Sequence, residues 1–198
     1  MKIKETLKRI SALALTLALG ASLCLVGCSD GSEDPVGSES GSVSDSDLPV
    51  IEKATAILDE LSVPYEVHVY SAHRTPNEAH EFSATAEEKG FGVLICAAGM
   101  AAHLAGVVAA STTLPVIGIP CKGPVFDGMD ALLATVQMPT GIPVATVAVN
   151  GGANAALLAS EILAVGDSEL AKKLKTKREN DSKKVLEKDK IICAKFNA

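Results

Sequence analysis

The segment Ser71-Ala72-His73-Arg74-Thr75-Pro76 places two groups side by side that can act on an anionic substrate. An imidazole exchanges protons near neutral pH, and a guanidinium can bind a phosphate or a carboxylate through two parallel hydrogen bonds. His73 beside Arg74 therefore indicates proton transfer on a phosphorylated substrate. The spacing alone is explained equally well by a surface loop with a solvated histidine and arginine.

A second segment, Ala97-Ala98-Gly99-Met100-Ala101-Ala102-His103-Leu104, follows an apolar run and opens an Ala-rich helix. The small side chains of Ala98 and Gly99 allow backbone N–H groups at a helix N-terminus to approach an anion closely. His103 lies one turn further on and can donate to the same ligand. The alternative is tight packing of helix on sheet around a core histidine.

The cysteines point to no metal site, because none of the five stands in a Cys/His spacing that binds zinc. Cys96 lies in an apolar run and is expected to pack as a small reduced thiol. Cys121 opens the turn-rich segment 121–128, which is typical of a lid or rim, but nothing in the sequence activates its thiol. We therefore predict no metal site.

From Pro49 onward, apolar runs alternate with segments of helical period. Because the apolar runs do not alternate with polar residues, both faces of the sheet must be covered by helices. The sequence thus predicts an α/β fold, a three-layer doubly wound parallel sheet of the flavodoxin or Rossmann type. Ligands of such sheets bind at the carboxyl ends of the strands, where both segments described above fall. Helices are expected over 49–61, 77–89, 100–110, 130–136, 153–165 and 168 to about 188, and strands over 65–70, 92–97, 115–120 and 143–149.

Composition argues against a nucleic-acid partner. The 198 residues carry a formal net charge of -6, only 3% are aromatic, and none is Trp. Phosphate backbones select clustered Lys and Arg, and single strands select aromatic stacking platforms. The expected ligand is therefore a small molecule.

The N-terminal residues have the pattern of a bacterial export signal. Basic residues up to Arg9 precede an uncharged apolar run from Ile10 to Val26, which is shorter than a membrane-spanning helix. The run ends in Leu25-Val26-Gly27-Cys28, which resembles the lipobox of lipoproteins and implies cleavage before Cys28 and lipid attachment to its sulfur. A domain without a disulfide framework is instead typical of the cytoplasm, so the location stays open between the cytoplasm and a lipid-anchored form. The expected organisation is a signal peptide at 1–27, a flexible Ser/Gly/Asp-rich tether at 28–43, a folded domain at 44–190 and a C-terminal tail at 191–198.

Several long segments, in order, resemble one enzyme family, the N5-carboxyaminoimidazole ribonucleotide mutases (PurE, class I) of purine biosynthesis. This family is the bacterial type of phosphoribosylaminoimidazole carboxylase, and the resemblance covers roughly residues 44–190. It implies a small ribonucleotide and CO2 as reactants, no cofactor, and assembly as a homo-octamer. The segments are SAHRTP (71–76), AAGMAAHLAGVVAA (97–110), LPVIGIPCKG (114–123), DGMDALLATVQMPTGIPVATVAVNG (127–151) and NAALLASEIL (154–163).

The resemblance also implies roles for individual residues. His73 would protonate the substrate so that CO2 leaves the exocyclic nitrogen, and would later remove the ring proton once carbon has recaptured CO2. A dry pocket would hold the CO2 beside the ring. The family's phosphate and ribose contacts fall on Ser44, Asp47, Ser71 and Arg74, and its carboxylate contacts fall on Ala98, Gly99, His103 and Leu104.

Three departures from the family pattern stand out. Val43 stands where the family has glycine in its nucleotide loop; an alternative register on Gly41-Ser42 restores the glycine at the cost of a two-residue insertion. Asp34–Ser42 stands where the family has its apolar first strand, and it is too polar to form one, so we expect that strand to be degenerate or missing. Ala97 also replaces a family glycine.

Three hypotheses remain open from the sequence. The chain is an active mutase; or it is an inactive, lipid-anchored nucleotide-binding relic that lost its first strand; or its N-terminus is an artefact of gene assembly or fusion in front of a cytoplasmic enzyme. The sequence also leaves open whether the direct carboxylase reaction, with free CO2, is preferred.

Overall fold

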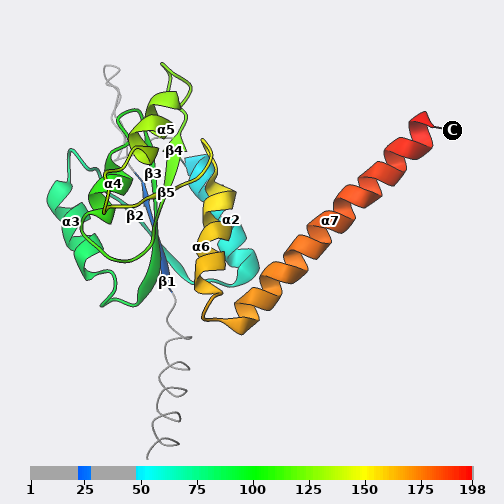
Figure 1. Ribbon diagram of the computed structural model, residues 1–198, viewed down its shortest axis with the longest axis horizontal. Coiled ribbons are helices and arrows are strands. Elements are labelled where there is room, and N and C mark those ends of the chain that lie inside the picture. The colour runs from blue at the N-terminus through cyan, green and yellow to red at the C-terminus, as the bar shows by residue number, and fades with distance from the viewer. Residues whose placement is uncertain (1–21, 28–47, 198) are drawn as a thin grey trace, which may run out of the picture.

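The computed structural model describes residues 48–197 and the backbone of residues 22–27, and these form one five-stranded parallel sheet (Figure 1). The strand order is β2-β1-β3-β4-β5, so the chain direction across the sheet reverses between β1 and β3. This order is that of flavodoxin-like domains, and their ligands bind at the reversal point. The strands are β1 (Ser22–Gly27), β2 (Tyr65–Val69), β3 (Phe91–Gly99), β4 (Val116–Cys121) and β5 (Ala145–Thr146).

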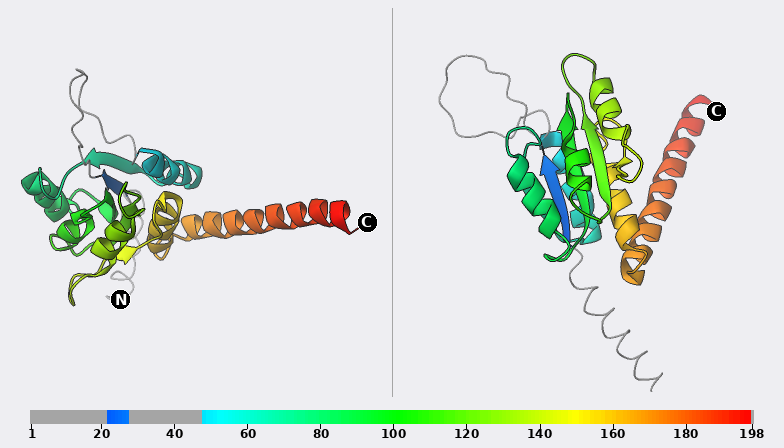
Figure 2. Two further views of the ribbon diagram at one scale, coloured as in Figure 1. Left: turned by 90° about the horizontal axis from the view of Figure 1, so that it is seen from above. Right: turned by 60° about the vertical axis from the view of Figure 1, so that its left-hand side comes forward.

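Helices cover both faces of the sheet, as Figures 1 and 2 show. Helices α2 (Leu48–Leu61) and α6 (Gly152–Leu163) lie on one face. Helices α3 (Pro76–Thr85), α4 (Leu104–Ala109) and α5 (Met129–Val136) lie on the other. The predicted doubly wound α/β fold is confirmed.

The apolar character of the strands follows from this cover on both faces. Along β3, Val93 and Ile95 pack in the core beneath α2 and α6. The intervening Leu94 and Cys96 pack in the core beneath α3, α4 and α5. Because successive side chains of a strand point to opposite faces, every position of this strand must be apolar.

The place of a first strand in the sheet is occupied by β1, which comes from another segment than the one at 34–42 that is expected from the sequence to be degenerate or missing. Strand β1 is an interior strand of the sheet and pairs in parallel with β2 on one side and β3 on the other. Its residues, Ser22–Gly27, belong to the segment that the sequence assigns to the export signal. Residues 34–42, which stand in the family's first-strand position, lie outside the described residues.

Some element limits also differ from the prediction. Helix α4 begins at Leu104 rather than at Met100, because Met100 has a φ of 52° and interrupts the helical backbone. Strand β5 has only two residues, but the backbone N–H groups of Val147 and Asn150 continue the contact by donating to carbonyl oxygens of β4.

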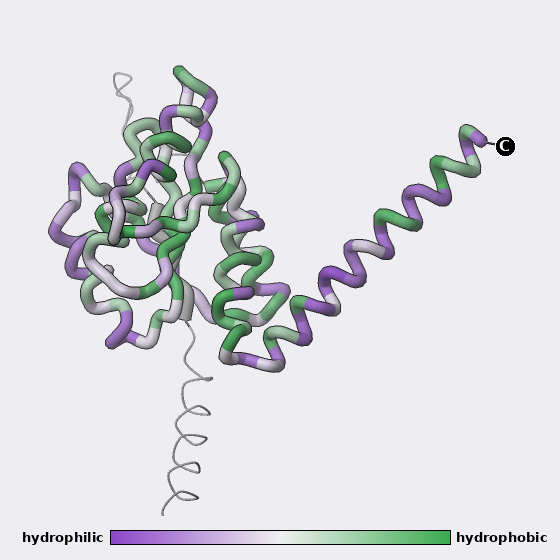
Figure 3. The backbone as a smooth tube through the Cα atoms, in the orientation of Figure 1, coloured by the Kyte–Doolittle hydropathy of each residue, from purple (hydrophilic) through white to green (hydrophobic). Residues whose placement is uncertain are grey.

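The C-terminal helix α7 (Ser168–Phe196) continues past Lys188 into the residues expected to form a tail. Leu170 is buried against the core, whereas residues 181–197 are all exposed. Figure 3 shows mainly hydrophilic residues along this projecting part. No helix among residues 48–197 is both long enough and apolar enough to cross a membrane.

Candidate active site

The turn after β2 holds His73 and Arg74 at the carboxyl edge of the sheet. The hydroxyl of Ser71 accepts hydrogen bonds from the backbone N–H of His73 (3.4 Å) and of Arg74 (3.2 Å). The hydroxyl of Thr75 in turn accepts from the backbone N–H of Ser71 at 2.7 Å. These side chains satisfy backbone groups that have no partner in a strand or helix. The turn therefore has a defined shape and presents His73 and Arg74 on exposed positions.

The turn after β3 brings in the second segment. The left-handed backbone at Met100 ends the strand, and two tight hydrogen bonds follow, from Ala102 N–H to Met100 O and from His103 N–H to Ala101 O. His103 is the residue that precedes α4, and its imidazole is exposed. The alternative of a core histidine is therefore wrong for His103.

The two turns meet through their histidines. His73 Nε2 lies 2.9 Å from His103 Nδ1, and the ring centroids are 5.1 Å apart with an edge-to-face angle of 74°. A ring nitrogen is either a donor or an acceptor, so one of these two nitrogens must be protonated and the other must be unprotonated for the hydrogen bond to form. The arrangement is a pair of imidazoles through which a proton can be held or passed.

The remaining predicted residues divide into three groups. Gly99 lies at the end of β3 and is partly exposed, and Arg74 is exposed beside His73. Ala98 is 4% exposed and Leu104 is fully buried, so both side chains belong to the core. Ser44, Asp47 and Cys28 lie outside the described residues.

The loop after β4 forms the rim beside these turns. Its Lys122 makes an exposed ion pair with Asp127, with 2.9 Å between Nζ and Oδ1. The carboxamide of Asn150 accepts from the backbone N–H of Lys122 at 2.8 Å and so ties this loop to the segment after β5. Sequence reasoning missed Asn150, although the Asn150-Gly151 dipeptide is a recognised turn signal.

The thiols near this edge are not placed for catalysis. Cys96 and Cys121 are both buried in the core. Burial raises the pKa of the Cys96 thiol to about 12, so it stays protonated. Among residues 48–197, no cluster of three or more His, Cys, Asp or Glu side chains could hold a metal ion.

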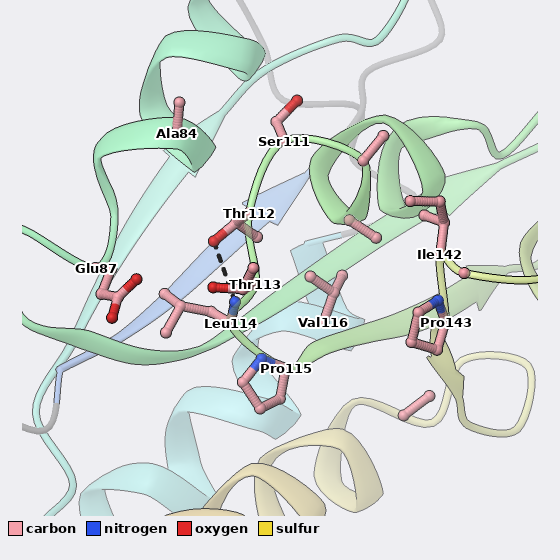
Figure 4. Close-up of a pocket in the computed structure, with 14 residues that line it drawn as sticks. Ala84, Glu87, Ser111, Thr112, Thr113, Leu114, Pro115, Val116, Ile142 and Pro143 are labelled. Carbon is pink, nitrogen blue, oxygen red and sulfur yellow. Dashed lines mark hydrogen bonds between the residues drawn. The ribbon is translucent and has the colours of Figure 1, made fainter.

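A separate pocket of about 920 Å³ opens at the other end of the sheet, where β4 and β5 begin (Figure 4). Its wall combines the hydroxyls of Ser111, Thr112 and Thr113 with apolar side chains such as Ile142. Glu87 is the ionisable group in its lining, and none of the predicted site residues contributes to it. The residues that could carry out proton transfer and bind an anion therefore lie at the carboxyl edge of the sheet and not in this pocket.

The fold and the site define a class: a flavodoxin-like domain with an imidazole pair and an exposed arginine at the reversal point of its sheet. The sequence model of AIR carboxylase matches residues 41–184. The chain belongs to this AIR carboxylase family.

Individual relatives agree with this assignment. The chain is 52% identical over 149 residues to the N5-carboxyaminoimidazole ribonucleotide mutase of Pyrococcus horikoshii, which covers 75% of this chain and 84% of the relative. It is 53% identical over 146 residues to the Bacillus subtilis enzyme of the same name, with 73% and 90% covered. A crystal structure of Treponema denticola PurE2-S38D superposes with a TM-score of 0.69 at 25% identity, covering 86% of this chain and 97% of that one.

Proposed function

We propose that the chain is an N5-carboxyaminoimidazole ribonucleotide mutase, which moves a carboxyl group from the exocyclic nitrogen of an aminoimidazole ribonucleotide to its ring carbon. The observation that carries the proposal is the 2.9 Å contact between His73 and His103 at the carboxyl edge of an AIR carboxylase domain. A proton carrier at the reversal point of the sheet is what this rearrangement needs.

The proposed chemistry returns His73 to its starting state. Protonated His73 gives its proton to the exocyclic nitrogen, the N–C bond to the carboxylate breaks, and CO2 is released. The ring carbon then attacks CO2, and neutral His73 removes the proton from that carbon to restore the aromatic ring. His73 gives one proton and recovers one proton, so the enzyme ends in its starting protonation state and the reaction consumes no cofactor.

The other residues bind and orient the substrate in this proposal. Arg74 lies next to His73 on an exposed position, where its guanidinium can bind the phosphate. Ser71 shapes the turn through its hydrogen bonds to both neighbours and joins Arg74 at the phosphate. The backbone of Ala98, Gly99 and Leu104 together with the His103 ring surrounds the migrating carboxylate, and Ser44 and Asp47 bind phosphate and ribose.

We also propose that the enzyme works as a homo-oligomer, up to the octamer of the family. Both imidazoles are exposed, whereas retention of CO2 requires a site closed to water. Apolar side chains also stay exposed beside the rim, and an exposed apolar patch of this kind is typical of a subunit contact. They are Val125, Phe126, Met129, Leu133 and Val136, with exposures of 46% to 67%.

The alternative of an inactive relic loses its main support. It depended on a sheet without its first strand, and β1 occupies that place. The export signal at 1–27, the tether at 28–43 and a lipid on Cys28 remain a separate proposal about location, which probing Cys28 for lipid in fractionated cells would test.

The assay for the proposal is conversion of the carbamate nucleotide by the purified full chain. We expect turnover by the parent, and we expect His73→Asn to abolish turnover while nucleotide binding persists. Supplying bicarbonate with the uncarboxylated nucleotide separates direct carboxylation from the mutase reaction. Equal turnover by parent and His73→Asn would disprove the assignment.

A further inference from the structure

Strand β1 comes from outside the part of the chain that matches the family. The family match begins at residue 41, whereas β1 spans Ser22–Gly27. Five residues of β1 pair with β2, from Leu23 opposite Tyr65 to Gly27 opposite Val69. All six pair with β3, ending with Gly27 opposite Ala97. A segment beyond the family match thus supplies an interior strand of the sheet.

The same residues form the end of the export signal. The lipobox-like sequence Leu25-Val26-Gly27-Cys28 predicts processing between Gly27 and Cys28. Gly27 is also the last residue of β1. Processing at this bond would therefore remove the whole strand from the mature chain.

Removal of β1 would leave its two neighbours without partners. Strands β2 and β3 each bond to β1 and not to one another in the described sheet. They are separated by two interstrand spacings, about 9.6 Å, which is too far for direct hydrogen bonds. Backbone N–H and C=O groups on both strands would lose their partners in the middle of the domain, where each such loss is unfavourable.

The histidine pair depends on this spacing. His73 lies in the turn after β2 and His103 in the turn after β3, and β1 is the strand between them. The 2.9 Å contact between the rings therefore depends on the spacing of β2 and β3, which β1 determines because it lies between them. Loss of β1 changes the relative position of the two turns and with it the pair.

We propose that Ser22–Gly27 serves either as the central strand or as the end of a cleaved signal, so that catalysis and lipidation at Cys28 exclude one another in a single molecule. The catalytically competent chain retains these residues. The statement about folding is independent of the proposed function, and only its catalytic consequence rests on it.

The test compares full chains made in a membrane-free translation system, where no lipidation occurs. The variants are Leu25→Pro, which removes a ladder N–H from a central strand, Leu25→Val as a matched strand-forming control, and Cys28→Ala as a control for the lipid site. A chain starting at Cys28 reproduces the processed polypeptide. Hydrogen exchange of the β2 and β3 amides reports the sheet, and turnover of the carbamate nucleotide reports the site.

We expect the parent, Leu25→Val and Cys28→Ala chains to protect these amides and to turn over at similar rates. We expect the Leu25→Pro chain and the chain starting at Cys28 to lose the protection and at least 100-fold in turnover. A chain starting at Cys28 that keeps β2 and β3 protected would overturn the inference, as would a lipidated chain from membranes with full activity. A protected but inactive parent would instead contradict the proposed function and leave the inference standing.

Discussion

From the hydrogen bond between the two histidines we predict how the rate losses caused by substituting each of them combine in a double variant. His103 meets His73 through Nδ1. An asparagine at position 103 can place a polar atom close to that position, whereas a leucine of similar size cannot. The informative set is therefore His103→Leu and His103→Asn, each made with His73 intact and with His73→Asn.

The expected magnitudes follow from the roles of the two rings. Loss of a proton carrier costs about 10²- to 10⁴-fold in rate, and we expect this for His73→Asn. Loss of one orienting hydrogen bond costs about 0.5–1.5 kcal/mol, which is about 2- to 13-fold in kcat. We expect this loss of kcat for His103→Leu. We expect His103→Asn to recover much of the lost kcat.

The assay is single-turnover conversion of the carbamate nucleotide at saturating enzyme, with nucleotide binding measured separately. Because His103 orients His73 through this hydrogen bond in addition to facing the carboxylate, His103→Leu should cost less in the His73→Asn background than with His73 intact. If the two losses instead multiply, His103 acts on the substrate independently, and the coupling inferred from the 2.9 Å contact is refuted.

Three further predictions concern the frame of the site. Gly152→Ala places a methyl group against the backbone of α2 and should lower stability by about 1–3 kcal/mol in thermal unfolding, whereas Gly166→Ala, whose nearest atom would lie 4.0 Å away, should not. Burial raises the pKa of the Cys96 thiol, so at pH 8 maleimide should label exposed Cys193 quickly and Cys96 only after unfolding. Fast labelling of native Cys96 would contradict its burial. A hydrogen bond to a carboxylate in the last turn of α2 raises the pKa of Lys177 above 10.5. This ion pair stabilises the packing of α7 by at most about 1 kcal/mol. Because the pKa is higher in the folded chain than in the unfolded chain, the stabilisation is present below pH 10.5 and is lost as the pH rises through the pKa of the folded chain. Lys177→Met should therefore remove that part of the alkaline loss of stability, and an unchanged pH profile would contradict the role.

Most of the fold could be predicted from the periodicity of apolar residues along the sequence and from the apolar character of its strands. Strands β3 and β4 are apolar at every position because cores lie on both of their faces, and this requires helices above and below. The helix at 49–61 and the turn at Gly90, which has a φ of 87°, also agree with local signals. The contact of the two histidines could not be predicted from spacing, because 30 residues separate them and only the strand order brings them together.

The misplaced first strand has a different cause. The segment Ser22–Gly27 is apolar and short, and such a run is compatible with an export signal, a buried strand or part of a helix. Its basic N-terminal flank favoured the signal, and the polar Asp34–Ser42 left the strand position apparently empty. Only pairing with β2 and β3, which are distant in sequence, distinguishes the strand.

The strand order also fixes a sequence of events during translation. Residues 22–27 are synthesised before both of their partner strands, and β3 is complete only when Gly99 has been added. At about 5–20 residues per second, the ribosome needs about 4–14 s for that interval. During those seconds the apolar segment lacks at least one of its two partner strands and is accessible to factors that bind nascent signals. The proposed exclusion between strand and signal is consequently a competition between elongation of the chain and capture of its N-terminal segment, and it takes place before the complete sheet can form.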